Sequence, residues 1–548
     1  MILNILDTIG NWNPQLFREI KGRLKIGNIA VASLLSICAQ LLLFWTYRAQ
    51  IPVPPPAGQY TNPTYNKFCS SLDANNPICL RDVAGNFQIN WQYWYLELFV
   101  YLSIFSAIAL LVVGTYMLVS DLDKEERRGT LNFIRLSPQS AKTIFLGKIL
   151  GVPILLYLAA ILAVPLHLYS GLAAQIPLHH ILSFDIAMVA SCALFYSGAM
   201  LFGLTTSWLG GFQPWLASAA VLIFITTTFD VSSFGNADLL TFLSPAAVLK
   251  QVVSPVNPSS DNLSWLITKI TYVEWFNLHV GENILACTAL SLLIAAVATY
   301  WMWQGWQRRF PNPTATVLSK KQSYLLVICY QSIILGFALE SNTISVNLWC
   351  LFLMNFLLLL ALIAALTPER QALSDWARYR KQIVPSNHKL WRRYPILDLI
   401  WSEKSPAQVA IAINFFISTV IFIPEILVSR NAFLFMILFV NILMIYATVT
   451  QLFLFAKIRN QEILAVCTVG GAIVLPPIIL YMLSLTPEKA PFMWLFSVLG
   501  GLIVERASPH TIFLSMLGQW TVLVLLNLQL RRQLRIAGES ASKQLLRA

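Results

Sequence analysis

Residue types that could do chemistry are sparse in this chain, and few of them lie close together. His179 and His180 precede Asp185, and this is the only compact group in the sequence that could bind a metal or transfer a proton. We expect it to be a polar boundary, because neither a Ser-His-Asp order nor a His-Glu-x-x-His motif accompanies it. The sequence therefore predicts no catalytic residue and no metal site.

A phosphate-binding loop for ATP is also missing from the sequence. Gly147-Lys148 resembles the end of Gly-x-x-x-x-Gly-Lys-Ser/Thr, but Lys142 stands where the first Gly belongs and Ile149 follows the Lys. We expect no cofactor in this chain. Any ATP and Mg²⁺ on which it depends would be bound by a separate polypeptide.

Charged residues are concentrated instead in the segment 121–148, which lies between two long apolar runs. Its first residues carry both signs of charge, and Gly129 can end a helix there. Residues 130–136 form a short amphipathic stretch whose apolar side chains could dock on a partner. Ser137 and Pro138 suit the N-cap and first position of the next helix, which should run through Lys148.

The composition places these segments in a membrane protein. Hydrophobic residues make up 57% and charged residues 11% of the chain, and the mean hydropathy is +0.66. Continuous apolar runs of span length predict an all-α polytopic fold with about twelve transmembrane helices. The predicted spans are 28–46, 96–119, 149–170, 182–207, 212–229, 282–304, 323–339, 345–366, 407–428, 432–455, 462–483 and 511–529.

A short apolar segment near the C-terminus and the distribution of Lys and Arg set the expected topology. Pro491–Val504 is apolar but short, so we expect an interfacial or re-entrant helix. Short inside loops accumulate Lys and Arg, which places both termini in the cytoplasm of a prokaryotic plasma (inner) membrane protein. The net charge of +12 then needs no nucleic-acid partner. The inside segments are 1–27, 120–148, 208–211, 305–322, 367–406, 456–461 and 530–548.

Residues 13–25 have the pattern of a basic amphipathic helix ahead of the first span. Asn13 suits the N-cap and Pro14 the first helical position. Apolar and basic side chains share the helix, namely Leu16, Phe17, Ile20 and Leu24 against Arg18, Lys21, Arg23 and Lys25. We expect it to lie in the inner membrane interface.

These motifs together resemble the type-2 ABC transporter permeases, the membrane subunits of many ABC exporters. The resemblance covers residues 1–305 best. It consists of an Asn-Pro-x-Leu-x-Arg-Glu helix before the first span, then Glu-x-Arg-x-Gly-Thr-Leu, Leu-Ser-Pro-x-Ser and Leu-Gly-Lys after the second. It implies that the first helix is an elbow and that the loop after the second span is a coupling helix on which a separate ABC ATPase docks.

The resemblance assigns roles to individual residues. The implied elbow residues are Leu16, Phe17, Arg18, Glu19, Ile20 and Lys21. The implied ATPase-docking residues are Glu125, Glu126, Arg128, Gly129, Thr130, Leu131, Ser137 and Pro138.

The chain beyond the first permease-like half, 1–310, is expected to contain a degenerate repeat. Two additional spans and a basic cytoplasmic stretch occupy 311–394, and a degenerate second half occupies 395–548. Pro395–Pro406 resembles a second elbow, with Ser405 and Pro406 capping the ninth span. The segment 456–462 lies where a second coupling loop belongs but lacks its motifs. The assembly could therefore be a homodimer or a heterodimer of permeases.

Two cysteines and one long loop are expected on the outside. Cys69 and Cys79 lie in a loop rich in Pro and Asn that cannot build a core, so a disulfide between them is expected, the alternative being two reduced thiols. Within Asp230–Asn283, residues 239–253 suggest one or two short helices at the outer interface.

Three function classes follow from these patterns. The resemblance implies an exporter of an apolar or amphipathic cargo, such as a lipid, glycan or drug, driven by ATP hydrolysed on a separate subunit. The alternatives are an ATPase-independent secondary transporter and an integral membrane enzyme. The first alternative is weakened because Glu97, Asp185, Asp230, Glu340 and Glu425 all fall toward span ends.

Overall fold

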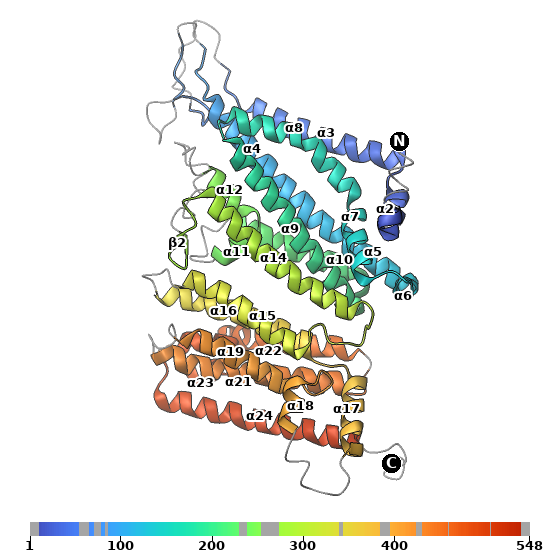
Figure 1. Ribbon diagram of the computed structural model, residues 1–548. Helices are drawn as coiled ribbons and strands as arrows, with labels where there is room; N and C mark the ends of the chain where they lie inside the picture. Colours follow the sequence, from blue (N-terminus) through green and yellow to red (C-terminus); the bar gives the residue numbers. More distant parts are fainter. Residues whose placement is uncertain are drawn as a thin grey trace. The chain divides into compact units, whose positions relative to one another are not determined.

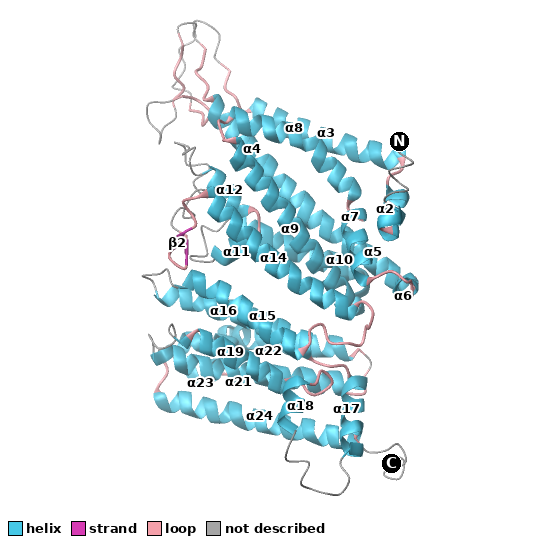
Figure 2. Ribbon diagram, viewed as in Figure 1, coloured by secondary structure: helices cyan, strands magenta, loops and turns pink. Residues whose placement is uncertain are grey.

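The computed structural model shows a protein that is almost entirely helical (Figures 1 and 2), with helix in about 79% of it. The only sheet among the described residues is a two-stranded ladder of β1 (Glu274–Trp275) and β2 (Leu278–His279). The described residues are 10–53, 65–70, 78–82, 86–229, 238–253, 273–338, 344–383, 395–423, 430–458, 460–504 and 506–538. Asp230, Glu340 and Glu425 lie outside them.

The chain divides into two compact units. The first comprises residues 1–311 with 336–347, and the second comprises 312–335 with 348–548. The first unit thus ends close to the sequence boundary expected at residue 310. Most of 311–394, expected as a separate segment, groups with the C-terminal residues.

Nine helices of the described residues are long and apolar enough to cross a membrane, or ten if the bent pair Phe352–Leu366 and Arg370–Arg380 is one span. Three expected spans are absent from the nine. The helix expected over 323–339 carries several polar side chains. The helix expected over 345–366 belongs to the bent pair, and the helix expected over 407–428 ends at Ile421. Twelve spans therefore stay a prediction.

The first unit is a bundle of long helices with short helices at one end. Its apolar helices are α3 (Ile26–Ala49), α4 (Trp91–Ile108), α8 (Ile154–Ala173), α9 (Leu178–Thr205), α10 (Gln213–Phe229) and α14 (Ile284–Arg309). α9 and α10 are joined by the 3-10 helix η2 (Ser207–Phe212). α9 packs along α14, and α3 packs along α8.

The second span of this unit contains one π-helical turn. α4 continues through η1 (Ala109–Val113) into α5 (Gly114–Arg127), so that one apolar helix runs from Trp91 to Arg127. The hydroxyl of Tyr196 donates to the carbonyl of Leu110 at 2.7 Å, which satisfies a backbone group at the turn. Such turns are frequent at functional sites.

One end of the first unit carries the disulfide and two short helices. Cys69 and Cys79 are joined by a disulfide bond. α11 (Asp238–Phe242) and α12 (Ala246–Val253) form two short helices in the expected place. Each residue of α12 is buried in the chain, and the expected location of these helices at the outer interface stays a prediction.

The second unit contains α16 (Ile344–Leu366) in large part, α17 (Arg370–Ile383), α18 (Pro395–Trp401), α19 (Gln408–Ile421), α21 (Arg430–Phe455), α22 (Gln461–Met482) and α24 (Pro509–Ala537). Most of α15 (Lys320–Ala338) belongs to it as well. Pro491–Val504 forms α23 (Pro491–Trp494) and the 3-10 helix η7 (Val498–Ile503), which are too short to span a bilayer, as expected.

Neutral polar side chains join three helices inside the second unit. Gln331 of α15 donates to Asn355 of α16 and to Ser418 of α19, the latter at 2.6 Å. All three side chains are buried. Interhelical hydrogen bonds of this kind hold spans together in an apolar medium.

Candidate functional site

The charged segment expected to dock on a partner forms a helix, a turn and a second short helix. α5 ends at Arg127, and Gly129 adopts a left-handed backbone with φ 71° that only glycine takes readily. α6 (Thr130–Arg135) follows, and α7 (Ala141–Gly151) then leads into α8. We call the end of the first unit with α2, α6 and α7 the basic end (Figure 1).

The expected elbow helix is α2 (Pro14–Arg23), and its N-cap is the predicted one. The side chain of Asn13 accepts a hydrogen bond from the amide of Leu16 at 3.0 Å and donates to the carbonyl of Thr143 at 2.9 Å. This residue therefore begins α2 and also attaches it to α7.

α2 packs closely against α7 because two glycines of α7 lie beneath it. A Cβ added at Gly147 would lie 2.8 Å from the backbone nitrogen of Leu16, and one at Gly151 would lie 2.5 Å from the Cβ of Glu19. The face that α2 buries contains Gln15, Leu16, Glu19 and Ile20. Leu16 and Ile20 pack inside the chain, so their side chains do not reach a membrane interface, whereas the placement of α2 at the inner interface stays a prediction.

Six charged side chains of α2, α5 and α7 lie close together beside this contact between α2 and α7, and we call them the ion cluster. They are Arg18, Glu19 and Arg23 of α2, Asp121 and Glu125 of α5, and Lys148 of α7.

Lys148 is at the centre of the ion cluster and is fully buried. Its Nζ lies 2.6 Å from Asp121 Oδ2, 2.7 Å from Glu125 Oε2 and 4.0 Å from Glu19 Oε1. Burial by itself would lower the pKa of the ammonium, but the three carboxylates outweigh it and raise the pKa above its usual range. Lys148 is therefore a fixed positive charge.

Arginines complete the ion cluster from the side of α2. Arg23 donates to Asp121 at 2.6 Å and to Glu19 at 3.2 Å, and Arg18 bridges Glu125 and Glu19. The cluster thus joins α2, α5 and α7, and its Arg18–Glu125 pair alone connects residues 107 positions apart in sequence.

The three carboxylates of the ion cluster are the one group of described residues with the spacing of a metal site. The space between them already holds the ammonium of Lys148, with Arg18 and Arg23 at the rim. A cation there would have to displace Lys148. We therefore interpret the cluster as a structural joint between helices.

α6 is the most exposed part of the basic end. Leu131 and Ile134 face the rest of the chain and are buried, whereas Phe133 is 79% exposed. Leu136, which directly follows the last residue of α6, is 86% exposed. Thr130 donates to the carbonyl of Glu125 at 3.2 Å, which fixes the start of α6 on α5. Two large apolar side chains are thereby presented on the surface.

The implied docking residues differ in exposure. Glu126, Arg128, Gly129, Thr130 and Pro138 are exposed, and Ser137 is partly buried. Glu125 and Leu131 are buried within the chain, the first in the ion cluster. Phe133 and Leu136, two of the apolar side chains of 130–136 expected to be available for docking, are the exposed ones, whereas Leu131 and Ile134 are buried.

The predicted capping role of Ser137 and Pro138 is wrong. The N-cap of α7 is Ser140, whose Oγ accepts from the amide of Thr143 at 3.1 Å. Ser137 instead donates to the carbonyl of Ile134 at 2.7 Å and so closes the end of α6. Residues 136–139 form the turn between α6 and α7, so α7 begins after Ser137 and Pro138.

A second group that sequence order did not reveal lies deeper in the first unit. Ser103 Oγ is 2.9 Å from His167 Nε2, and His167 Nδ1 is 3.7 Å from Asp185 Oδ1. Ser103, His167 and Asp185 thus follow one another in the contact order of a hydrolytic triad. Ser103, however, is fully buried, and its hydroxyl donates to the carbonyl of Phe99. The rings of His179 and His180 contact each other edge to face, and the histidine that lies beside Asp185 is His167.

The expected second elbow in the other unit is α18, and it too is held by a buried lysine. Lys320 donates to the carbonyl of Leu399 and the hydroxyl of Ser405, both at 2.6 Å. Burial lowers the pKa of this ammonium to about 8, against the opposing effect of Asp398. The capping role predicted for Ser405 and Pro406 is wrong, since Ala407 begins α19 without a side-chain cap.

Comparison with known proteins adds no identification. No family model matches the chain, and no curated protein and no solved structure matches it significantly. The function must therefore be argued from the residues themselves.

Proposed function

We propose that this chain is the permease subunit of an ATP-driven exporter and that a separate ABC ATPase docks on α6. The observation that supports this most is the exposed pair Phe133 and Leu136, on a short helix that joins two apolar helices. Exposed aromatic and aliphatic side chains surrounded by charge are typical of protein interfaces. The cargo class is apolar or amphipathic.

The ion cluster gives this docking surface a mechanical connection. α6 follows α5 directly, and Lys148 ties α5 to α7 and α2. A force applied to α6 would therefore move the helices that continue from all three elements. In this proposal the ATPase closes on ATP, displaces α6, and changes the side to which the transport path opens.

The remaining parts of the proposal concern assembly and location. Both termini and the basic end face the cytoplasm of a prokaryotic inner membrane, where short basic loops accumulate. Two permease chains, identical or different, surround the transport path. Lys320 and α18 support a second, degenerate half, because a buried lysine holds a short helix there as well.

The docking proposal is tested by Phe133→Ala with Leu136→Ala, purified alongside the unaltered chain and probed for an ABC ATPase that co-purifies with the unaltered chain. Both side chains are exposed, so the double variant should fold normally, since exposed truncations usually change stability by less than about 0.5 kcal/mol. We expect loss of co-purification and of ATP-dependent transport. Leu278→Ala, exposed at the opposite end of the first unit, is the matched control.

Three outcomes separate the function classes. Normal co-purification and transport by the double variant would contradict docking on α6. Transport that persists without any ATPase and collapses with the ion gradient would support a secondary transporter. Turnover of a substrate by the purified chain alone would support an enzyme.

A further inference from the structure

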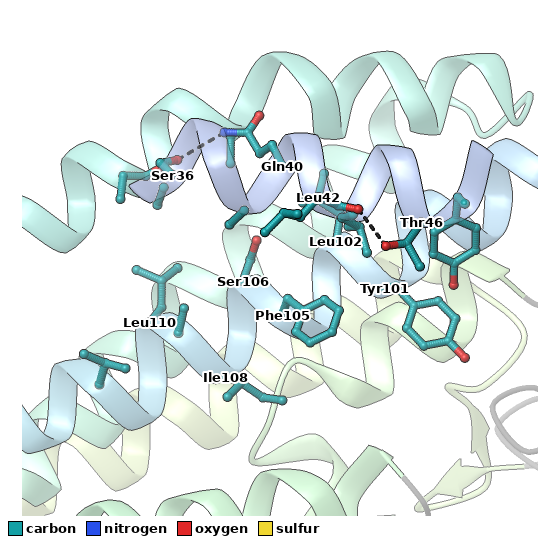
Figure 3. Close-up of a pocket in the computed structure, with 18 of the residues that line it drawn as sticks. Ser36, Gln40, Leu42, Thr46, Tyr101, Leu102, Phe105, Ser106, Ile108 and Leu110 are labelled. Atoms are coloured by element: carbon teal, nitrogen blue, oxygen red, sulfur yellow. Dashed lines mark hydrogen bonds between the residues drawn. The ribbon is translucent and has the colours of Figure 1, made fainter. Parts of the chain in front are cut away.

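The first unit contains a pocket of about 920 Å³ that no step of the proposed function uses. It lies between α3, the helix α4–η1 and α8 (Figure 3). Its size is within the range of about 300–1,000 Å³ typical of ligand sites. A pocket of this size can hold a hydrocarbon chain.

The lining of the pocket is apolar along most of its length. Figure 3 shows Leu102, Phe105, Ile108 and Leu110 along the α4–η1 wall, facing α3. Alanines at 159, 160 and 163 form the α8 wall and leave the space open. The polar groups of Ser36 and Gln40 form hydrogen bonds within the wall. The hydroxyl of Ser36 donates to the carbonyl of Ala159, and the amide of Gln40 donates to Ser36.

Polar groups gather at the end of the pocket that is remote from the basic end. Tyr47, Gln50, Lys67 and Tyr101 line it there. Lys67 Nζ lies 2.6 Å from Glu97 Oε2, and the hydroxyl of Tyr93 donates to the same carboxylate. The two opposite charges cancel, so this end is polar and carries no net charge.

The pocket opens sideways between α3 and α4–η1. Its lining residues Leu42, Phe105 and Val113 are 69%, 55% and 45% exposed. Both helices have the length and composition of membrane spans, so the medium at this opening is hydrocarbon. Water in an apolar pocket finds too few polar partners, whereas an acyl chain matches the lining.

We propose that this pocket binds a membrane phospholipid, with one acyl chain against α3, α4–η1 and α8 and the headgroup at Gln50 and Lys67. The gradient from apolar to polar lining matches a molecule with one apolar and one polar end. Because Glu97 neutralises Lys67, chain fit rather than headgroup charge governs binding. The proposal goes beyond the proposed function, since the chain binds the lipid whether or not an ATPase docks on α6.

The test is photocrosslinking of the purified full chain in nanodiscs containing phosphatidylcholine with a diazirine in its acyl chain. We expect crosslinks on the pocket residues of α3, α4–η1 and α8 that unlabelled phospholipid competes away. Ala160→Trp should remove these crosslinks by filling the pocket. Ile161→Trp adds the same side chain at a position 65% exposed on α8 and should leave them unchanged.

A second variant protects the test against misfolding. Ala109→Leu fills the pocket from the opposite wall and should produce the same loss of crosslinks. Melting temperatures of both variants should match that of the Ile161→Trp control.

Several results would overturn the proposal. Equal labelling of all lipid-facing helices, unchanged by Ala160→Trp and Ala109→Leu, would show only annular lipid. A strong preference for phosphatidylglycerol over phosphatidylcholine would contradict the neutral polar end. Loss of binding here leaves the α6 docking test unaffected.

Discussion

Lys148 is the residue that connects the most parts of the basic end, and its burial makes it sensitive to change. Its ammonium lies within 4.0 Å of three carboxylates contributed by α2 and α5. Breaking a buried ion pair by removing one partner leaves the other charge buried without compensation, which is costly. Lys142 lies on the same helix, but its side chain is exposed.

Replacement of Lys148 by Met should therefore destabilise the protein by about 3–5 kcal/mol, measured as a drop in the thermal unfolding temperature in detergent. Lys142→Met should change it little. The carboxylates raise the pKa of Lys148, so its stabilising contribution should persist at neutral pH and be lost as the pH rises through the folded-state pKa. Equal stability of the two variants would show that the cluster is not a joint.

Among the elements, α2 depends on α7 for its position more than on its own amphipathic pattern. Isolated ten-residue helices are marginal in water, so packing must hold α2. Gly147 allows the close approach, because a Cβ there would meet both the backbone of Leu16 and the side chain of Gln15. Gly198 on α9 has nothing within 4 Å of the corresponding position.

Gly147→Ala should separate α2 from α7 and cost about 1–3 kcal/mol, the usual range for overpacking. Gly198→Ala should be neutral or stabilising, because alanine is the better helix former. Thermal unfolding of the two variants in the same detergent gives the comparison. Protection of α2 amides from hydrogen exchange should fall only in Gly147→Ala, and unchanged protection would contradict the packing argument.

At the scale of the whole molecule, the three elements of the ion cluster lead into the three walls of the lipid pocket. α2 precedes α3, α4–η1 continues into α5, and α7 precedes α8. A movement of α5 at the basic end would therefore reach the pocket along one continuous helix, Trp91–Arg127. The basic end and the disulfide lie at opposite ends of the first unit (Figure 1).

This arrangement predicts opposite accessibility for the two ends in intact cells. In a background without the free cysteines, Arg128→Cys at the basic end should react only with a membrane-permeant maleimide. Leu278→Cys should react with an impermeant maleimide as well, because in the proposed orientation its end, which carries the disulfide, faces the outside. The reverse pattern would contradict the orientation argued from the basic residues.

Much of the helical architecture could be predicted from sequence because it depends on composition and on neighbours in the chain. Apolar runs require helices in a bilayer, and Asn13 and Gly129 mark helix boundaries through contacts a few residues away. The cap of α7 could not be chosen this way, since Ser137 and Ser140 both fit the pattern.

The sequence by itself determined a helical protein with span-length apolar helices, a charged segment between two of them, and the start of α2 at Asn13. Only the tertiary structure decided that Lys148 meets carboxylates of α5 and α2, that Leu131 faces inward while Phe133 faces outward, and that a pocket opens beside α3. The physical reason is range. Hydropathy and capping act within a few residues, whereas an ion cluster or a pocket exists only where separate helices pack together.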